Sequence, residues 1–167
     1  MYKKGDRIVY PLYGAGIIED IEVKDIDGEL LTYYALNIPV GNLIIKISAA
    51  KANELGVRNI ISKDKMLTDL HRAVGITVDM PDNWNVRYKE NMERIKTGDL
   101  LQVAIVFSSL LSRERDRGLS TAEKKMMTSA KQIILSELIL SLDIERLEAE
   151  DILNNIFSNA LLDDTLE

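Results

Sequence analysis

The sequence predicts an α+β protein, with a small antiparallel β domain followed by an all-helical domain. Over the first 61 residues, apolar side chains alternate with polar ones, which is typical of strands with one face in a core. From residue 62 onward, apolar side chains recur three and four positions apart, which is typical of helices with one buried face. The change of period predicts a β domain over 1–61, a short helix and connector over 62–83, and a helical domain over 84–167.

Short strands joined by tight turns are expected in the β domain. Asp27-Gly28 and the segment 39–42 carry residue types that form turns, and Pro11 with the glycines of 14–16 should break or bulge the first strands. Strands are therefore expected over 17–24, 30–38 and 43–48, in a strongly bent antiparallel sheet or half-open barrel.

Two of these strands are expected to have one face in the core and one in solvent. The core faces should carry Leu43, Ile45 and Ile47 in one strand, and Ile17, Ile21 and Val23 in the other. Lys46 and Lys24 fall on the opposite faces, where they should point to solvent.

A short helix over 63–73 and four further helices are expected in the rest of the chain. Cap residues mark where these helices begin: Asp82 or Asn83 for Trp84–Lys96, Asp99 for the helix from Leu100, and the Ser120–Glu123 capping box for the next. Gly98 and Gly118 mark two ends. The last helix presents Ala149, Ile152, Leu153, Ile156 and Phe157 on one face. Four helices with one apolar face each predict a compact bundle.

The composition is that of an ordinary globular protein, with 167 residues, 46% of them hydrophobic and 29% charged. The chain has no cysteine, which excludes disulfides, thiolate zinc sites and cysteine nucleophiles. No apolar run is long enough for a membrane span, and the first residues lack the apolar core of a signal peptide. A cytoplasmic protein is therefore expected.

Charge is distributed unevenly along the chain. The net charge of −6 argues against a nucleic-acid partner, because basic surfaces are what neutralise phosphates. However, residues 84–131 hold 10 basic and 6 acidic residues, whereas residues 132–167 hold 1 and 9. A DNA-facing patch and an ordinary solvated helix surface both explain this basic middle segment.

The residues give little support to an enzyme. The chain has no phosphate-binding loop, and its one histidine, His71, has no second ligand or base nearby in sequence. Glu137 falls within the apolar stripe of its helix, where a pairing arginine such as Arg87 or Arg94 is the expected partner. A hydrolase that uses Glu137 or His71 is a third hypothesis. No catalytic residue, cofactor or metal site is predicted.

The only tryptophan, Trp84, lies at the start of a predicted helix, shortly after a proline. Arg87, Tyr88 and Lys89 follow within two turns, and the helix start adds backbone N–H donors suited to phosphate. An apolar wedge flanked by cations is how several minor-groove proteins distort DNA. The alternative is that Trp84 packs between the two domains as a buried hinge residue.

Four motifs together resemble the CarD/CdnL family of bacterial transcription regulators. They are GDRIVYPLYGAG over 5–16, NWNVRYK over 83–89, TGD over 97–99 and RGLSTAEKK over 117–125. The first is shared with the RNA-polymerase-interacting domain of the transcription-repair coupling factor. Its combination with the others, in this order and spacing, is much more specific, and the match runs through nearly the whole chain.

The resemblance implies a Tudor-like N-terminal domain that binds the RNA polymerase β subunit. It also implies a helical domain that contacts promoter DNA at the upstream edge of the transcription bubble. By this analogy Trp84 is the minor-groove wedge, supported by Arg87, Tyr88 and Lys89, and Lys124 and Lys125 contact phosphates. The positions that match the family's basic polymerase contacts are Lys24 and Lys46.

The expected function is therefore that of a non-enzymatic transcription factor that docks on RNA polymerase and stabilises the promoter open complex. The alternative is a protein-interaction adaptor without DNA contact. Whether Lys24, Lys46 and Trp84 lie on separate accessible surfaces discriminates the two, because a buried Trp84 favours the adaptor.

Overall fold

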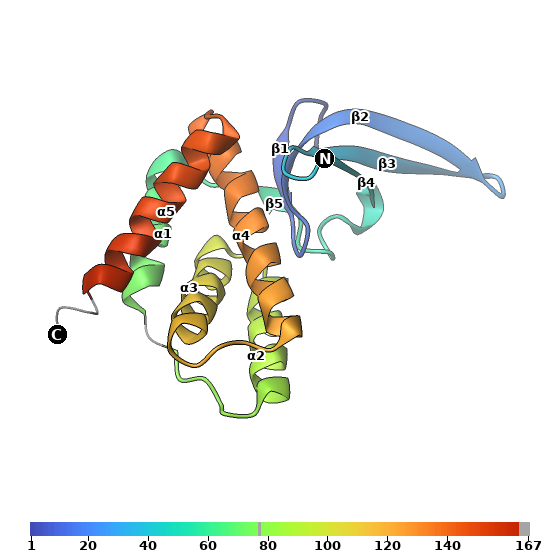
Figure 1. Cartoon of the computed structure of the whole chain (residues 1–167). Helices are drawn as coiled ribbons and strands as arrows, with labels where there is room; N and C mark the ends of the chain where they lie inside the picture. Colours follow the sequence, from blue (N-terminus) through green and yellow to red (C-terminus); the bar gives the residue numbers. More distant parts are fainter. Residues whose placement is uncertain (77, 164–167) are drawn as a thin grey trace.

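The computed structural model describes residues 1–76 and 78–163, with side chains described as far as residue 158. It consists of a five-stranded antiparallel sheet followed by five α-helices (Figure 1), which confirms the predicted fold class: a small Tudor-like β domain followed by a helical domain. The strands are β1 (Arg7–Tyr10), β2 (Gly14–Ile26), β3 (Glu29–Ile38), β4 (Leu43–Ser48) and β5 (Arg58–Asn59). The helices are α1 (Lys63–Gly75), α2 (Trp84–Lys96), α3 (Leu100–Asp116), α4 (Thr121–Leu142) and α5 (Arg146–Asp163).

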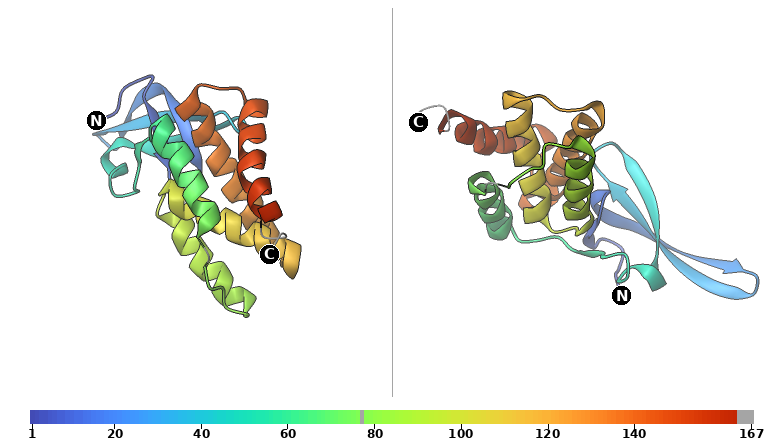
Figure 2. Two further views of the ribbon diagram at one scale, coloured as in Figure 1. Left: turned by 90° about the vertical axis from the view of Figure 1, so that its left-hand side faces the viewer. Right: turned by 90° about the horizontal axis from the view of Figure 1, so that it is seen from below.

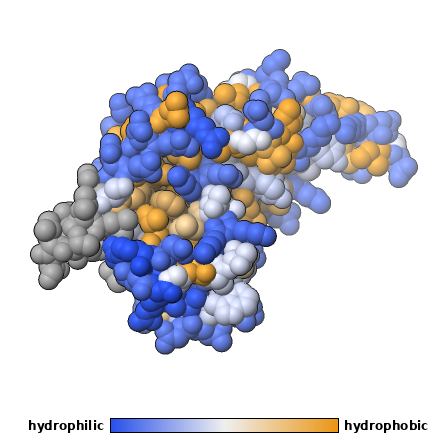
Figure 3. Space-filling model, viewed as in Figure 1, coloured by the Kyte–Doolittle hydropathy of each residue, from blue (hydrophilic) through white to orange (hydrophobic). Residues whose placement is uncertain are grey.

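The sheet has the strand order β4-β3-β2-β1-β5, so β4 and β5 are its edges. β1 is short, and on the β2 side it covers only the first residues of that strand, from Gly14 to Ile17. The rest of β2 pairs with β3 alone, so these two strands project as a long hairpin arm (Figures 1 and 2). The arm ends at Asp27 and Gly28, both with positive φ, as the predicted hairpin turn requires. Apolar side chains reach the surface along this arm (Figure 3), where Val23 and Leu30 are exposed.

One sheet prediction was wrong in its register. The alternation placed Ile17 on the core face of β2, whereas Ile18 is the residue that is completely buried. The pairing with β3 shifts between Ile18 and Asp20, so a bulge at Glu19 inserts one extra residue. Beyond the bulge the predicted core face is also wrong: Ile21 and Val23 are exposed, and so is Leu43 on β4. The arm extends past β1, so no further strand of the sheet covers these side chains. Lys24 is about half-exposed, as predicted.

The helical core draws on all five helices. α1 contributes Met66, Leu70 and Ala73 to the same apolar cluster as α3, α4 and α5, so the segment 62–83 is a connector only after α1. The predicted caps are present: Asn83 caps α2, Asp99 caps α3, and Ser120 with Glu123 forms the capping box of α4. Among the residues that the structure describes, no helix is long and apolar enough to cross a membrane.

The sheet packs against α4 through its first two strands. The contact is apolar at Val9, Ala15 and Leu140, and it is fixed by Ser136, whose hydroxyl accepts a hydrogen bond from the Ala15 N–H at 2.8 Å. A Cβ at Gly14 would lie 2.6 Å from the Ser136 hydroxyl oxygen. The absence of a side chain at Gly14, the first residue of β2, therefore permits close approach of the two domains.

Candidate functional site

The first turn of α2 holds Trp84 at the surface. Trp84 is 47% exposed, an unusual position for the largest apolar side chain of the protein. The Asn83 side chain accepts hydrogen bonds from the Asn85 and Val86 N–H groups at 2.9 and 3.3 Å, so it satisfies free donors of the helix start. The capped turn presents the indole at the surface, so the alternative in which Trp84 is a buried hinge residue is wrong.

Arg87 is buried behind Trp84 and joins the starts of α2 and α4. It is 5% exposed, and its Nε lies 2.7 Å from Glu123 Oε1. Its Nη1 donates to the carbonyl oxygens of Pro81 and Asp82 at 3.1 and 2.6 Å. The prediction that Arg87 contacts DNA is therefore corrected: its donors are used inside the protein, where they hold the chain before Trp84.

Glu123 is completely buried, but its hydrogen-bond partners favour the charged carboxylate. Burial alone would raise the pKa of this carboxyl group, but hydrogen bonds from Arg87 and from the Ser120 N–H and hydroxyl outweigh burial. The pKa of Glu123 is therefore lower than that of an ordinary glutamate. The motifs 83–89 and 117–125, which are distant in sequence, meet at this buried charge pair.

The other predicted residues of the helical domain lie around the same end. Lys89, Lys124 and Lys125 are exposed, and Lys124 lies 3.9 Å from Glu114. Tyr88 differs, because it is half-buried and packs on the helical core. Sequence reasoning missed Arg117, which lies 3.4 Å from Asp82 and adds an exposed cation beside the Trp84 turn. Its place in the motif 117–125 is the signal that could have identified it.

The sheet carries the second predicted cluster. Lys46 on β4 and Lys24 on β2 are about half-exposed, as predicted, and they flank Glu22 at 2.9 and 4.0 Å. The hydrogen bond to Glu22 raises the pKa of Lys46. The Lys24 ammonium also lies 5.6 Å from the centre of the Tyr33 ring. Since β4 is an edge strand with exposed Leu43 and Ile44, the cluster borders an edge open to further pairing.

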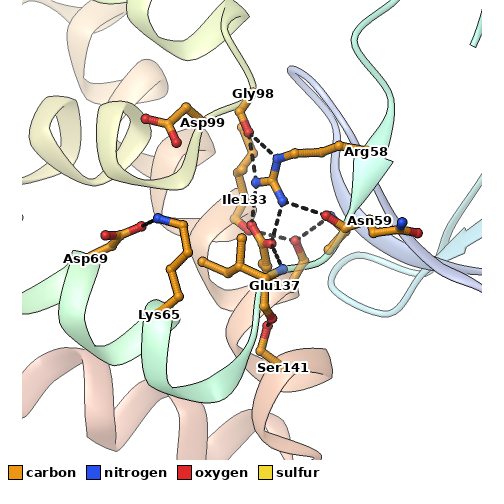
Figure 4. A network of polar contacts seen from close by, with 12 residues as sticks. Arg58, Asn59, Lys65, Asp69, Gly98, Asp99, Ile133, Glu137 and Ser141 are labelled. Carbon is orange, nitrogen blue, oxygen red and sulfur yellow. Dashed lines mark hydrogen bonds and ion pairs between the residues drawn. The ribbon is translucent and has the colours of Figure 1, made fainter. Parts of the chain in front are cut away.

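Glu137 lies at the junction of the two domains rather than in a catalytic pocket (Figure 4). Both of its oxygens accept hydrogen bonds from Arg58 at 2.8 Å, and the Ile61 N–H donates to it at 3.1 Å. An arginine partner was predicted, but the candidates Arg87 and Arg94 were wrong. These bonds engage both carboxylate oxygens, so the hydrolase hypothesis loses its candidate acid.

His71 is exposed on α1. Over the described part of the chain, no group of three or more histidine, aspartate or glutamate side chains could hold a metal ion.

The fold and these two surfaces define a class of protein. It is a two-domain protein with an open, lysine-bearing sheet edge and, on a separate helical domain, an exposed aromatic side chain among cations. Comparison with known proteins gives the family. Residues 2–61 match the model of the CarD-like/TRCF RID domain, and residues 69–154 match the model of the CarD C-terminal domain.

A relative in Bacillus subtilis (strain 168) carries the name "Putative transcription factor YdeB". It is 33% identical over 138 residues, which cover 83% of this chain and 90% of that protein. The chain belongs to the CarD family of transcription factors, and its β domain is of the RNA-polymerase-interacting kind. The resemblance predicted from the sequence motifs is thereby confirmed.

Proposed function

We propose that this protein binds the β subunit of RNA polymerase through its sheet. From that position, its helical domain contacts the minor groove at the upstream edge of the transcription bubble and stabilises the open promoter complex. The observation that carries the proposal is the exposure of Trp84 on a capped helix start, with Lys89, Lys124 and Lys125 exposed nearby. An apolar side chain can occupy the space at a distorted base step while the lysines neutralise phosphates.

The energy needed to open DNA indicates what polymerase and the helical domain each contribute. Unstacking a base step costs a few kcal/mol, which one tryptophan does not supply on intact duplex. Polymerase melts the DNA, and the factor then holds the opened edge. A polymerase-bound sheet also raises the effective concentration of the helical domain at the DNA, which offsets the weak DNA affinity expected of an acidic protein.

The polymerase contact is assigned to the β4 side of the sheet. An edge strand can pair with a strand of the partner through its main chain, with little demand on sequence. Lys24 and Lys46 then fix the register through carboxylates of the partner. They are lysines, so they contribute charge without the bidentate geometry of arginine.

The adaptor alternative predicts a buried Trp84. Trp84 is half-exposed at an end of the helical domain, whereas Lys24 and Lys46 lie on the sheet. The three residues thus occupy separate accessible surfaces, which favours the proposal over the adaptor.

Open-complex lifetime with the cognate polymerase tests the proposal. Wild type should prolong the lifetime on a slow-opening promoter, and Trp84→Ala should lose this effect while still co-precipitating with polymerase. Val86→Ala is the matched control, because it removes an exposed apolar side chain from the same turn. Lys46→Glu should lose polymerase binding and lifetime together, whereas Lys51→Glu, the same charge change elsewhere on the sheet domain, should lose neither. Loss of polymerase binding in Trp84→Ala would contradict the assignment of the two surfaces.

A further inference from the structure

The helix that carries Trp84 is tied to the sheet at its opposite end. Gly98 follows α2, and its carbonyl oxygen accepts hydrogen bonds from Nε and Nη2 of Arg58 at 3.0 and 2.8 Å (Figure 4). Arg58 belongs to β5 and pairs with Val9 of β1. The sheet therefore holds the C-terminal end of α2 directly, at the end of the helix opposite Trp84.

The turn at Gly98 has no room for a side chain. Gly98 has a φ of +70°, and a Cβ there would lie 2.6 Å from Cγ of Pro11, in the turn between β1 and β2. A side chain at this position would be strained by the backbone and blocked by the proline ring. Packing by Pro11 and hydrogen bonding by Arg58 thus hold the same short turn from the sheet side.

Glu137 fixes the guanidinium group that makes this contact. Its carboxylate binds Nη1 and Nη2 of Arg58 in a bidentate arrangement, and it is itself only 2% exposed. The Ile61 N–H at 3.1 Å holds one of the oxygens from the side of the connector. Arg58 is therefore oriented between α4 and Gly98, and its side chain links the sheet to two helices at once.

Trp84 and Gly98 lie at opposite ends of α2, so a small rotation of the helical domain about the Gly98 contact moves Trp84 by a large distance. Thirteen residues of α-helix span about 20 Å. A rotation of about 10° at one end displaces the other by about 3.5 Å. Successive bases along one DNA strand are about 3.4 Å apart, so such a rotation moves the indole by one base step.

We infer that Arg58 and Glu137 are positioning residues that set where Trp84 stands relative to the polymerase-docked sheet. This inference rests on the proposed function and adds to it a geometric requirement between the two domains. Neither residue touches DNA or polymerase in this mechanism. Weakening their contact lets the helical domain, with α2 in it, rotate against the sheet, so the wedge misses the upstream edge of the bubble even though both binding surfaces are intact.

The first test compares Arg58→Lys and Glu137→Gln with wild type. Arg58→Lys keeps the charge but loses the fork that reaches Glu137 and Gly98 together, and Glu137→Gln keeps the shape but loses the charge. Each should shorten the open-complex lifetime several-fold while polymerase co-precipitation stays unchanged. Asp143→Asn is the matched control, because it removes the negative charge from the exposed Arg7–Asp143 pair between the same domains. Asparagine tolerates the positive φ of that position, so no change in lifetime is expected.

The second measurement reports the geometry itself. The chain has no cysteine, so spin labels on Val23→Cys in the hairpin arm and Glu90→Cys in α2 report one interdomain distance. Both positions are exposed. The distance distribution should be narrow in the wild-type background and broader with Arg58→Lys or Glu137→Gln, at temperatures well below unfolding. A purely stabilising role would lower the melting temperature without broadening this distribution.

The outcomes separate the inference from the proposed function. An unchanged distance distribution, or a broadened one with an unchanged open-complex lifetime, overturns the positioning role and leaves the proposed function intact. If wild type itself does not prolong the lifetime, the proposed function fails. Shorter lifetime together with a broader distribution and intact polymerase binding supports the inference.

Discussion

Two glutamates on α4 each pair with an arginine. Glu123 lies in the first turn of the helix, and Glu137 lies near its C-terminal end. Glu123 and Arg87 are both buried and join α4 to the Trp84 turn within one domain. Glu137 is equally buried, but its partner Arg58 comes from the sheet and is 28% exposed. The same chemistry therefore serves local geometry in one place and domain orientation in the other. The bond lengths are similar, so we expect the exposure of the arginine to determine how much unfolding free energy is lost when each glutamate is removed.

The largest effect is expected from Glu123→Ala. It strands the Arg87 guanidinium in a site with little access to water, and removing one partner of a buried pair costs about 3–5 kcal/mol. It also removes the capping box of α4. Urea unfolding at neutral pH measures the loss. A loss below about 1 kcal/mol would mean that the pair contributes little to the fold.

Glu137→Ala should cost less, about 1–3 kcal/mol, because water can reach the freed Arg58 while the Ile61 N–H loses its acceptor. The same urea experiment, on the same day and in the same buffer, gives the comparison. Equal losses for Glu123→Ala and Glu137→Ala would show that the exposure of the arginine does not control the cost.

Acid should weaken the Glu123 pair in a defined pH window. A carboxyl group whose pKa is lowered in the folded state contributes stability above its unfolded pKa, about 4.3, and loses it as pH falls through the folded value. The difference in unfolding free energy between wild type and Glu123→Gln should therefore be constant near neutral pH and shrink below about pH 4.3. A difference that persists undiminished to about pH 2 would contradict the lowered pKa.

The parts of the fold that depend on local signals were predictable. The start of α2 at Trp84 and the capping box of α4 follow from residues within four positions of each helix start, and both are present as expected. The bulge at Glu19 was not predictable, because consecutive isoleucines at 17 and 18 fit either face of a strand. Only the pairing with β3 decides between them.

The partners of buried charges were the least predictable part of the site. The helical stripe of α4 indicates that Glu137 is buried and needs a cation, but Arg58 is 79 residues away on another domain. Arg87 lies three positions after Trp84, so the sequence places the two close together on the helix surface. That surface packs against α4, where Arg87 pairs with the buried Glu123 and its guanidinium group is not available to DNA. Both pairings, Glu137 with Arg58 and Glu123 with Arg87, are set by long-range packing, which leaves no local pattern in the sequence.

The smallest effect on stability is expected at the exposed counterpart of these pairs, where Glu22 contacts Lys46 at the sheet surface. Exposed pairs contribute little to folding, so Glu22→Gln should leave the urea midpoint unchanged. It should nevertheless tighten polymerase binding, because Glu22 competes for the lysines that the proposed contact needs and repels carboxylates of the partner. Titration of labelled protein with polymerase should give a Kd lower by about two- to fivefold, mostly at low salt. Glu29→Gln, the same change at the tip of the hairpin arm away from Lys46, is the control. Weaker binding by Glu22→Gln would instead mean that Glu22 itself contacts the polymerase.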